Sequence, residues 1–258
     1  MSEKNRDGKR TARERLAVER EKQKAADKRR RALIVGASVV CVLGLAAVIG
    51  VLAANAGKEK GSSAGPAVAP SGAQGKDSLA IPVGKDGAKS TLTVWEDFRC
   101  PACQAFEVAY RPTLHELADA GKLRIEYRLV RLIDGNLGGT GSLRAANAAA
   151  CAQDAGKFRD YHDVLYANQP KEETDDAFAN DDKLIELAGK VKGLDTPAFR
   201  KCVKDGTHNS WVDKSNKAFQ AGGFSGTPTV LLGGKNIYQD RSMTPAKLKE
   251  MVEAANRG

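Results

Sequence analysis

Residues 94–103 read VWEDFRCPAC, and this stretch decides the fold. The residues around its first half alternate and are rich in β-branched side chains, so Ser90–Asp97 predicts a strand. After the stretch, apolar residues recur at helical spacing, which predicts a helix over Pro101–Ala120. Its two cysteines therefore lie where a strand meets a helix.

Cys100 stands directly before the first turn of this helix, where a thiol is readily activated. The first N–H groups of a helix have no partner within the helix, and together with the helix dipole they stabilise an anion. The thiolate is the reactive form of cysteine, so we expect this position to lower the thiol pKa. Pro101 suits the first helical position, Cys103 follows about one turn later, and Arg99 adds a nearby positive charge. These features favour thiol–disulfide exchange.

Two other roles for the cysteine pair are weaker interpretations. A zinc site needs four ligands, but the sequence has no second CxxC, and its three histidines, His115, His162 and His208, lack ligand spacing. A purely structural disulfide across so short a loop would contribute little loop-closure entropy. We therefore expect neither a metal nor a cofactor, and we interpret Cys100-Pro101-Ala102-Cys103 as a redox-active site.

A second element supports the redox interpretation. Gly226-Thr227-Pro228 stands immediately before a short β-branched and apolar run, Thr229–Leu232. Proline is uncommon at such a strand edge, and a cis X–Pro bond is one reason for it to occur there. Gly-Thr-Pro alone is common in loops, but downstream of a strand–CPAC–helix unit it becomes informative.

The remaining elements complete an α/β pattern. Residues 122–131 alternate as a second strand, and residues 142–222 are largely helical. Two short strands around Gly233-Gly234 follow, and a helix over Thr244–Asn256 ends the pattern. This is a thioredoxin-like order with a helical insertion at about 140–222.

The N-terminal part has a different composition. Residues 1–31 carry thirteen Lys or Arg and six Asp or Glu, so most of the formal net charge of +9 lies there. Residues 32–54 carry no charge and are long enough to span a bilayer, which predicts a transmembrane anchor with a basic cytoplasmic tail. A signal peptide cleaved near Ala54-Asn55-Ala56 is the alternative. Residues 55–78 predict a flexible linker, and 79–258 the folded domain.

This distribution argues against nucleic acid as a partner. The basic residues are confined to a short tail beside an apolar run, and the chain has only two Trp and five Tyr to stack on bases. Apart from Cys41 in the apolar run, the four remaining cysteines form an even set. That number fits an oxidising compartment, with one redox pair and one structural pair.

Together these residues resemble the DsbA-like branch of the thioredoxin superfamily, most closely its membrane-anchored actinobacterial type. The resemblance covers about residues 79–256 and is carried by three segments: VWEDFR leading into the CPAC motif, Cys151-Ala152-Gln153 with Lys157-Phe158 and Tyr161-His162, and the 226–229 loop. It implies that Cys100 is a surface-exposed attacking thiol and Cys103 a buried resolving thiol. Thr227-Pro228 would be the cis-proline loop that holds an extended substrate. It also implies a structural disulfide between Cys151 and Cys202.

Some features depart from that pattern or are left open by it. Ala102 offers no side chain to stabilise the thiolate, so we expect Cys100 to be less acidified than in strong oxidants. Val94 occupies a position where many relatives carry a carboxylate. For Glu96 and Asp97 we favour a solvated strand end, with a proton acceptor for Cys103 as the alternative. His162 and Trp211 are interpreted as packing residues.

The expected function is an extracytoplasmic thiol–disulfide oxidoreductase that forms disulfides in exported proteins. The resemblance implies reoxidation by a quinone-linked membrane partner, such as a vitamin K epoxide reductase-like protein, and a monomer is the default. One alternative is a thiol reductase or isomerase of the same fold. The other is a non-catalytic module that binds proteins.

Overall fold

The computed structural model describes residues 66–240 and 242–257. In this part of the chain five strands form one sheet in the order β1-β3-β2-β4-β5. β2 (Ser90–Glu96) and β3 (Leu123–Leu129) are parallel, and the other neighbouring pairs are antiparallel. The other three strands are short, with β1 at Ile81–Val83, β4 at Thr229–Leu232 and β5 at Lys235–Asn236. The α/β thioredoxin-like order with a helical insertion is therefore confirmed.

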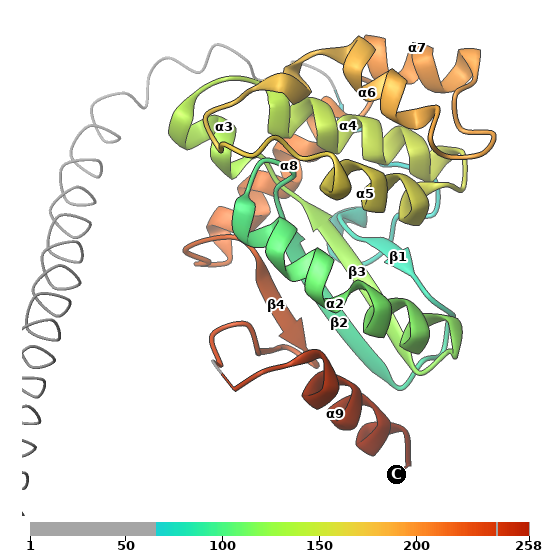
Figure 1. Ribbon diagram of the computed structural model, residues 1–258, viewed down its shortest axis with the longest axis vertical. Coiled ribbons are helices and arrows are strands. Elements are labelled where there is room, and N and C mark those ends of the chain that lie inside the picture. Colours follow the sequence, from blue (N-terminus) through green and yellow to red (C-terminus); the bar gives the residue numbers. More distant parts are fainter. Residues whose placement is uncertain (1–65, 241, 258) are drawn as a thin grey trace, which may run out of the picture. The chain divides into compact units, whose positions relative to one another are not determined.

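The centre of the sheet is buried on both faces. Alternation along β2 places Val94 and Trp95 on opposite sides of the sheet, and both are buried. Trp95 packs against Phe219 of α8 (Asn209–Ala221) with ring centroids 5.6 Å apart. The other face carries α2 (Pro101–Asp119), which lies along β2 and β3 in Figure 1. α9 (Pro245–Arg257) packs beside α2.

Most of the helical insertion gathers at one end of the sheet (Figure 1), and its last helix packs on the sheet face that carries Trp95. It begins directly after β3, earlier than expected, because α3 (Leu132–Leu137) contains Gly135 and little apolar pattern. Its central helix is α4 (Gly141–Asp154), whose buried alanines let neighbouring helices approach closely. The other elements are α5 (Phe158–Ala167), η2 (Ala177–Ala179), α6 (Asp181–Ala188), α7 (Pro197–Asp205) and α8.

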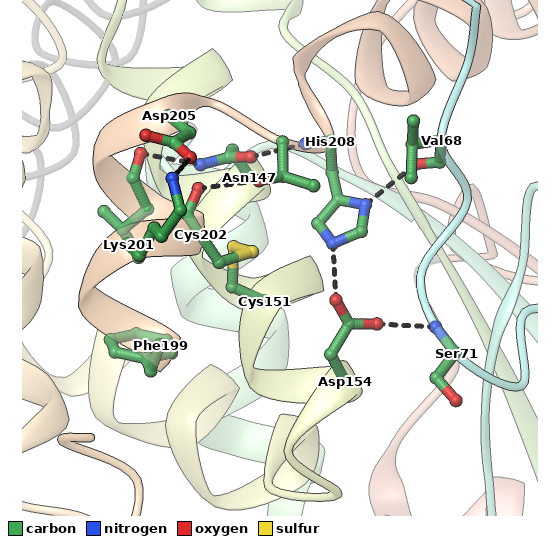
Figure 2. The surroundings of a disulfide bond; sticks show 12 residues. Val68, Ser71, Asn147, Cys151, Asp154, Phe199, Lys201, Cys202, Asp205 and His208 are labelled. Atoms are coloured by element: carbon green, nitrogen blue, oxygen red, sulfur yellow. Dashed lines mark hydrogen bonds and ion pairs between the residues drawn. A yellow bond between two sulfur atoms is a disulfide. The ribbon is translucent and has the colours of Figure 1, made fainter. Parts of the chain in front are cut away.

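The domain starts before residue 79, which corrects the expected end of the linker. Val68 O lies 2.8 Å from His208 Nδ1, and the Ser71 N–H donates to Asp154 Oδ1 at 2.7 Å (Figure 2). Trp211 is buried as expected and also donates its indole N–H to Ser78 O at 2.7 Å. These contacts fix residues 68–78, with η1 (Lys76–Ser78), onto α4 and α8. Residues 55–65 of the expected linker lie outside the described residues.

The expected tail at 1–31 and anchor at 32–54 also lie outside the described residues. Within residues 66–240 and 242–257, no helix is long and apolar enough to cross a membrane.

Cys151 and Cys202 form a disulfide that joins α4 to α7, as Figure 2 shows. Their Cα atoms are 5.9 Å apart and 51 positions separate them in the chain. Closing a loop of that length stabilises the fold by about 4 kcal/mol in the chain-entropy model. The pairing implied by the family resemblance is therefore present.

We expect the Cys151→Ala/Cys202→Ala variant to lose about 4 kcal/mol of unfolding free energy, because its unfolded chain regains loop entropy. Urea unfolding of the full-length variant and the parent protein measures this loss. In a Cys100→Ser/Cys103→Ser background, dithiothreitol should lower the midpoint of the protein that keeps the Cys151–Cys202 disulfide but leave that of the variant without it unchanged. A variant as stable as the oxidised parent would contradict the expectation.

Candidate active site

Cys100 is the N-cap residue of α2, and its extended backbone (φ −75°, ψ 117°) turns the chain from β2 into the helix. Its carbonyl accepts the first hydrogen bonds of the helix, from Cys103 N at 3.1 Å and Gln104 N at 3.2 Å. Pro101 is exposed at the first helical position. The sequence and the structure therefore agree on how the thiol reaches the helix N-terminus.

Both active-site cysteines are in the dithiol form, and Cys100 is more covered than expected. Cys103 is fully buried, and Cys100 is only 6% exposed, which corrects the expectation of a surface-exposed attacking thiol. The reason lies in the Thr227-Pro228 loop, since Cys100 Sγ is 3.3 Å from Thr227 O. A partner disulfide must therefore approach along this loop.

The Thr227–Pro228 peptide bond is cis, as predicted. Pairing of β4 with β2 brings Thr229 opposite Trp95, so the loop lies at the end of β2 from which α2 begins. Thr229 Oγ1 donates to Gly226 O at 2.7 Å and closes the loop on itself. The two motifs, 127 residues apart in sequence, thus meet at the Cys100 sulfur.

The surroundings of Cys100 lower the pKa of its thiol to about 6. The largest cause is a hydrogen bond from the Cys103 thiol, which outweighs the opposing effect of burial. The Thr227 side chain and the backbone N–H groups of Ala102 and Cys103 add to it. Ala102 therefore contributes through its backbone, although it has no polar side chain.

The Cys103 thiol behaves in the opposite way. Burial, its hydrogen bond to Cys100 and the nearby negative charges raise its pKa well above the ordinary value. At neutral pH the dithiol form therefore holds one thiolate, on Cys100, and one thiol, on Cys103. This division suits Cys100 to attack and Cys103 to resolve, as expected.

Arg99 does not act on the thiolate as the sequence suggested. Its guanidinium is buried and lies 2.8 Å from Asp134 and 3.0 Å from Asp176. It also donates to the carbonyls of Gly138 and Glu173. Its charge is paired with the two aspartates. All of these partners lie in the helical insertion, and Arg99 therefore links the active-site turn to the insertion.

Glu96 and Asp97 are both fully buried, so the favoured interpretation of a solvated strand end is wrong. Asp97 accepts hydrogen bonds from the N–H groups of Arg99 and Ile133 at 2.8 and 2.9 Å. Burial raises its pKa to about 7 despite these bonds. Glu96 shares the face of Val94 on β2, so the strand alternation itself could have indicated that Glu96 points inward.

His162 is more than a packing residue, because its Nε2 lies 2.7 Å from Glu96 Oε1. The ring is buried and packs against Phe98, Tyr127 and Tyr166. Sequence reasoning missed the pair because 66 residues separate its members. The ligand atoms of Glu96, Glu107 and His162 lie within 4.8 Å of one another, so these three side chains could also hold a cation.

A thioredoxin family model matches residues 77–254, which include every active-site residue described above. The chain belongs to the thioredoxin family. It is 30% identical over 173 residues to the probable disulfide bond formation protein D of Bacillus cereus, covering 66% of this chain and 77% of that protein.

Solved structures with at least 25% identity to this chain are also thiol–disulfide oxidoreductases or DsbA proteins. Reduced DsbA of Mycobacterium tuberculosis superposes with a TM-score of 0.60 at 27% identity, covering 70% of this chain and 93% of that one. The reduced oxidoreductase DsbG of the same organism gives 0.61 at 28% identity, covering 72% and 90%. With the CPAC geometry, these matches make the protein a DsbA-like thiol–disulfide oxidoreductase.

We expect Thr227→Val to raise the pKa of Cys100 above about 6, because the buried Thr227 hydroxyl, which bonds no other group among the described residues, is lost as a donor to the thiolate while the side-chain shape is kept. Thiolate absorbance at 240 nm against pH, on the reduced full-length protein, measures the pKa. Thr229→Val is the matched control, since the Thr229 hydroxyl bonds Gly226 O instead. An unchanged midpoint in Thr227→Val would show that the hydroxyl does not stabilise the thiolate.

Proposed function

We propose that this oxidoreductase works as an oxidase, introducing disulfides into exported proteins through Cys100 and Cys103. The observation that carries this direction is the lowered pKa of Cys100 to about 6. An ionised Cys100 stabilises the dithiol form relative to the disulfide, and a stabilised dithiol makes the disulfide form the stronger oxidant. The lowered pKa lies between the values of about 7 for thioredoxin and about 3.5 for DsbA.

The exchange reaction follows from the two thiols. A substrate thiolate attacks Cys100 of the disulfide form, and Cys103 leaves as the second sulfur of the dithiol. A second substrate thiolate then attacks the substrate sulfur of the mixed disulfide and releases Cys100. The substrate gains a disulfide and the protein becomes a dithiol. The relative named for disulfide bond formation supports disulfide formation as the reaction.

A membrane-bound, quinone-linked partner would reoxidise the dithiol, and the family resemblance suggests a vitamin K epoxide reductase-like protein for that role. The protein acts as a monomer in this proposal. The intact thiol pair and its asymmetric ionisation count against a non-catalytic binding module.

We expect the reduction potential of Cys100/Cys103 to lie above that of thioredoxin, about −270 mV. Equilibration of the full-length protein with glutathione, followed by alkylation and mass spectrometry, measures it. Cys100→Ser should abolish oxidation of a reduced substrate, and Cys103→Ser should accumulate mixed disulfides. A potential near −270 mV would favour a reductase, and a fully active Cys100→Ser would exclude the proposed reaction.

We further propose that residues 32–54 anchor the protein in the cell membrane with the domain outside. The uncharged run preceded by Lys28–Arg31 supports this topology. We expect the protein to resist carbonate extraction from membranes and the domain to be digested by protease added to cells stripped of their wall. A released domain whose N-terminus follows Ala56 would favour a cleaved signal peptide instead.

A further inference from the structure

The helical insertion is hydrogen-bonded to the active-site turn, residues 97–104, through residues 166–173. The Tyr166 hydroxyl donates to Asp97 O at 3.4 Å. In the other direction, Gln104 Nε2 on α2 donates to Tyr166 O at 2.8 Å. Residues 166–173 comprise the end of α5 and the chain that follows it, so this part of the insertion acts directly on the geometry of the turn.

Within this segment, Gln169 bonds the backbone of the attacking cysteine itself. Gln169 is buried, and its Nε2 donates to Phe98 O at 2.7 Å and to Cys100 O at 3.1 Å. A glutamine amide carries two N–H groups, so one side chain can satisfy both carbonyls. The amide therefore spans the part of the turn that runs from Phe98 to Cys100.

The sequence around Gln169 fixes the place of its backbone. Asn168 is the C-cap residue of α5, and its side chain donates to Val164 O at 2.7 Å and accepts from Lys190 Nζ at 2.6 Å. Pro170 follows, and a proline restricts the residue before it to an extended backbone. Gln169 is thus held between an anchored helix end and a proline, which limits the directions its side chain can take.

The orientation of the Gln169 amide is set by the turn and not by a partner of its own oxygen. Among the described residues, Gln169 Oε1 is buried and has no hydrogen-bond partner. A buried polar atom without a partner destabilises the fold. Turning the amide over would place Oε1 against the oxygens of Phe98 and Cys100, which repel it. The two N–H bonds to the turn therefore outweigh the cost of leaving Oε1 unbonded.

The place of the Cys100 carbonyl determines the angle at which the chain enters α2, and with it the position of the sulfur. The same carbonyl accepts the N–H groups of Cys103 and Gln104 at 3.1 and 3.2 Å. Cys100 Sγ lies 3.3 Å from Thr227 O and receives hydrogen bonds from the Cys103 thiol and from the start of the helix. Hydrogen bonds weaken steeply with distance and angle, so a small rotation of the Cys100 backbone would weaken several of them together.

We propose that Gln169 is a positioning residue for the attacking thiol. By bonding the carbonyls of Phe98 and Cys100, it holds the Cys100 sulfur where its surroundings favour the thiolate. Gln169 acts through the backbone of the turn and takes no part in the exchange of bonds between sulfur atoms. The inference rests on thiol–disulfide exchange at Cys100, and it holds whether that exchange oxidises or reduces the substrate.

A purely structural link between the insertion and the turn is the competing explanation, and Gln104 offers the matched comparison. Its side-chain amide also joins α2 to α5, but its acceptor is Tyr166 O and not a carbonyl of the turn. Removing either amide removes hydrogen bonding between the same two parts of the molecule, so both changes lower the free energy of unfolding. Only the loss of the Gln169 amide releases the carbonyl of Cys100.

The test compares Gln169→Met with Gln104→Met in the full-length protein. Methionine keeps the length of the side chain and removes the amide donors. A Cys41→Ala background leaves the active-site pair as the free thiols, and alkylation with mass spectrometry confirms that the second disulfide stays closed in the reduced samples. Thiolate absorbance at 240 nm against pH then follows Cys100, and equilibration with glutathione gives the redox equilibrium constant.

We expect Gln169→Met to raise the midpoint of the 240 nm titration by about one pH unit, because the sulfur loses part of the hydrogen bonding that favours its thiolate. Such a rise makes the dithiol form about fivefold less favoured over the disulfide at pH 7, by linkage from a parent midpoint of about 6. Gln104→Met should leave the midpoint and the equilibrium constant unchanged, although urea unfolding should show that both variants are less stable than the parent.

Two results would overturn the proposal: a folded Gln169→Met with the midpoint of the parent, or an equal rise of the midpoint in Gln104→Met. If Gln169→Met does not fold, Gln169→Asn decides, because its amide is one methylene shorter and is drawn away from the two carbonyls. An unchanged midpoint in that variant rejects the positioning role. The oxidase proposal is judged separately, by the potential of the parent, whereas Gln169 is judged by the difference between parent and variant.

Discussion

Three ionisable side chains, Glu96, Asp97 and Arg99, are buried where β2 turns into α2. The rest of the structure must supply partners for these buried groups. Burying a charge is costly unless a partner is buried with it. The helical insertion supplies these partners. His162 on α5 meets Glu96, the Ile133 N–H on α3 meets Asp97, and Asp134 on α3 meets Arg99. The insertion therefore provides opposite charges and hydrogen-bond donors to the active-site turn, and it also covers the sheet.

The same arrangement explains why two neighbouring thiols behave so differently. Cys100 receives hydrogen bonds from the helix start, Cys103 and the Thr227 loop, which favour its thiolate. Cys103 lies on the inner side, next to buried acids that disfavour a second negative charge. One turn of helix thus separates Cys100, whose surroundings favour a thiolate, from Cys103, whose surroundings disfavour one. Disulfide exchange uses this difference between the two pKa values.

The sequence predicted the strand–CPAC–helix unit and the Thr227-Pro228 loop because local signals define them: β-branched alternation, a proline at N1 and a proline before a strand. It also predicted that residues 142–222 are largely helical, and α5 to α8 lie in this range. It did not predict β1 or α3, which are short and have little pattern. The charge pairs behind the thiols were missed for another reason. Glu96 and His162, or Arg99 and Asp176, are far apart in the chain, and only tertiary packing joins them.

Residues 68–78 are fastened to α4 and α8 by His208, Asp154 and Trp211, close to the disulfide that joins α4 to α7. Tension applied through the preceding chain would therefore be carried first by the helical insertion and its covalent cross-link. The turn that carries the thiols contacts the same insertion, through His162 and Ile133. The covalent link between α4 and α7 would therefore resist distortion of the insertion, and with it distortion of the turn that holds the reacting sulfur atoms.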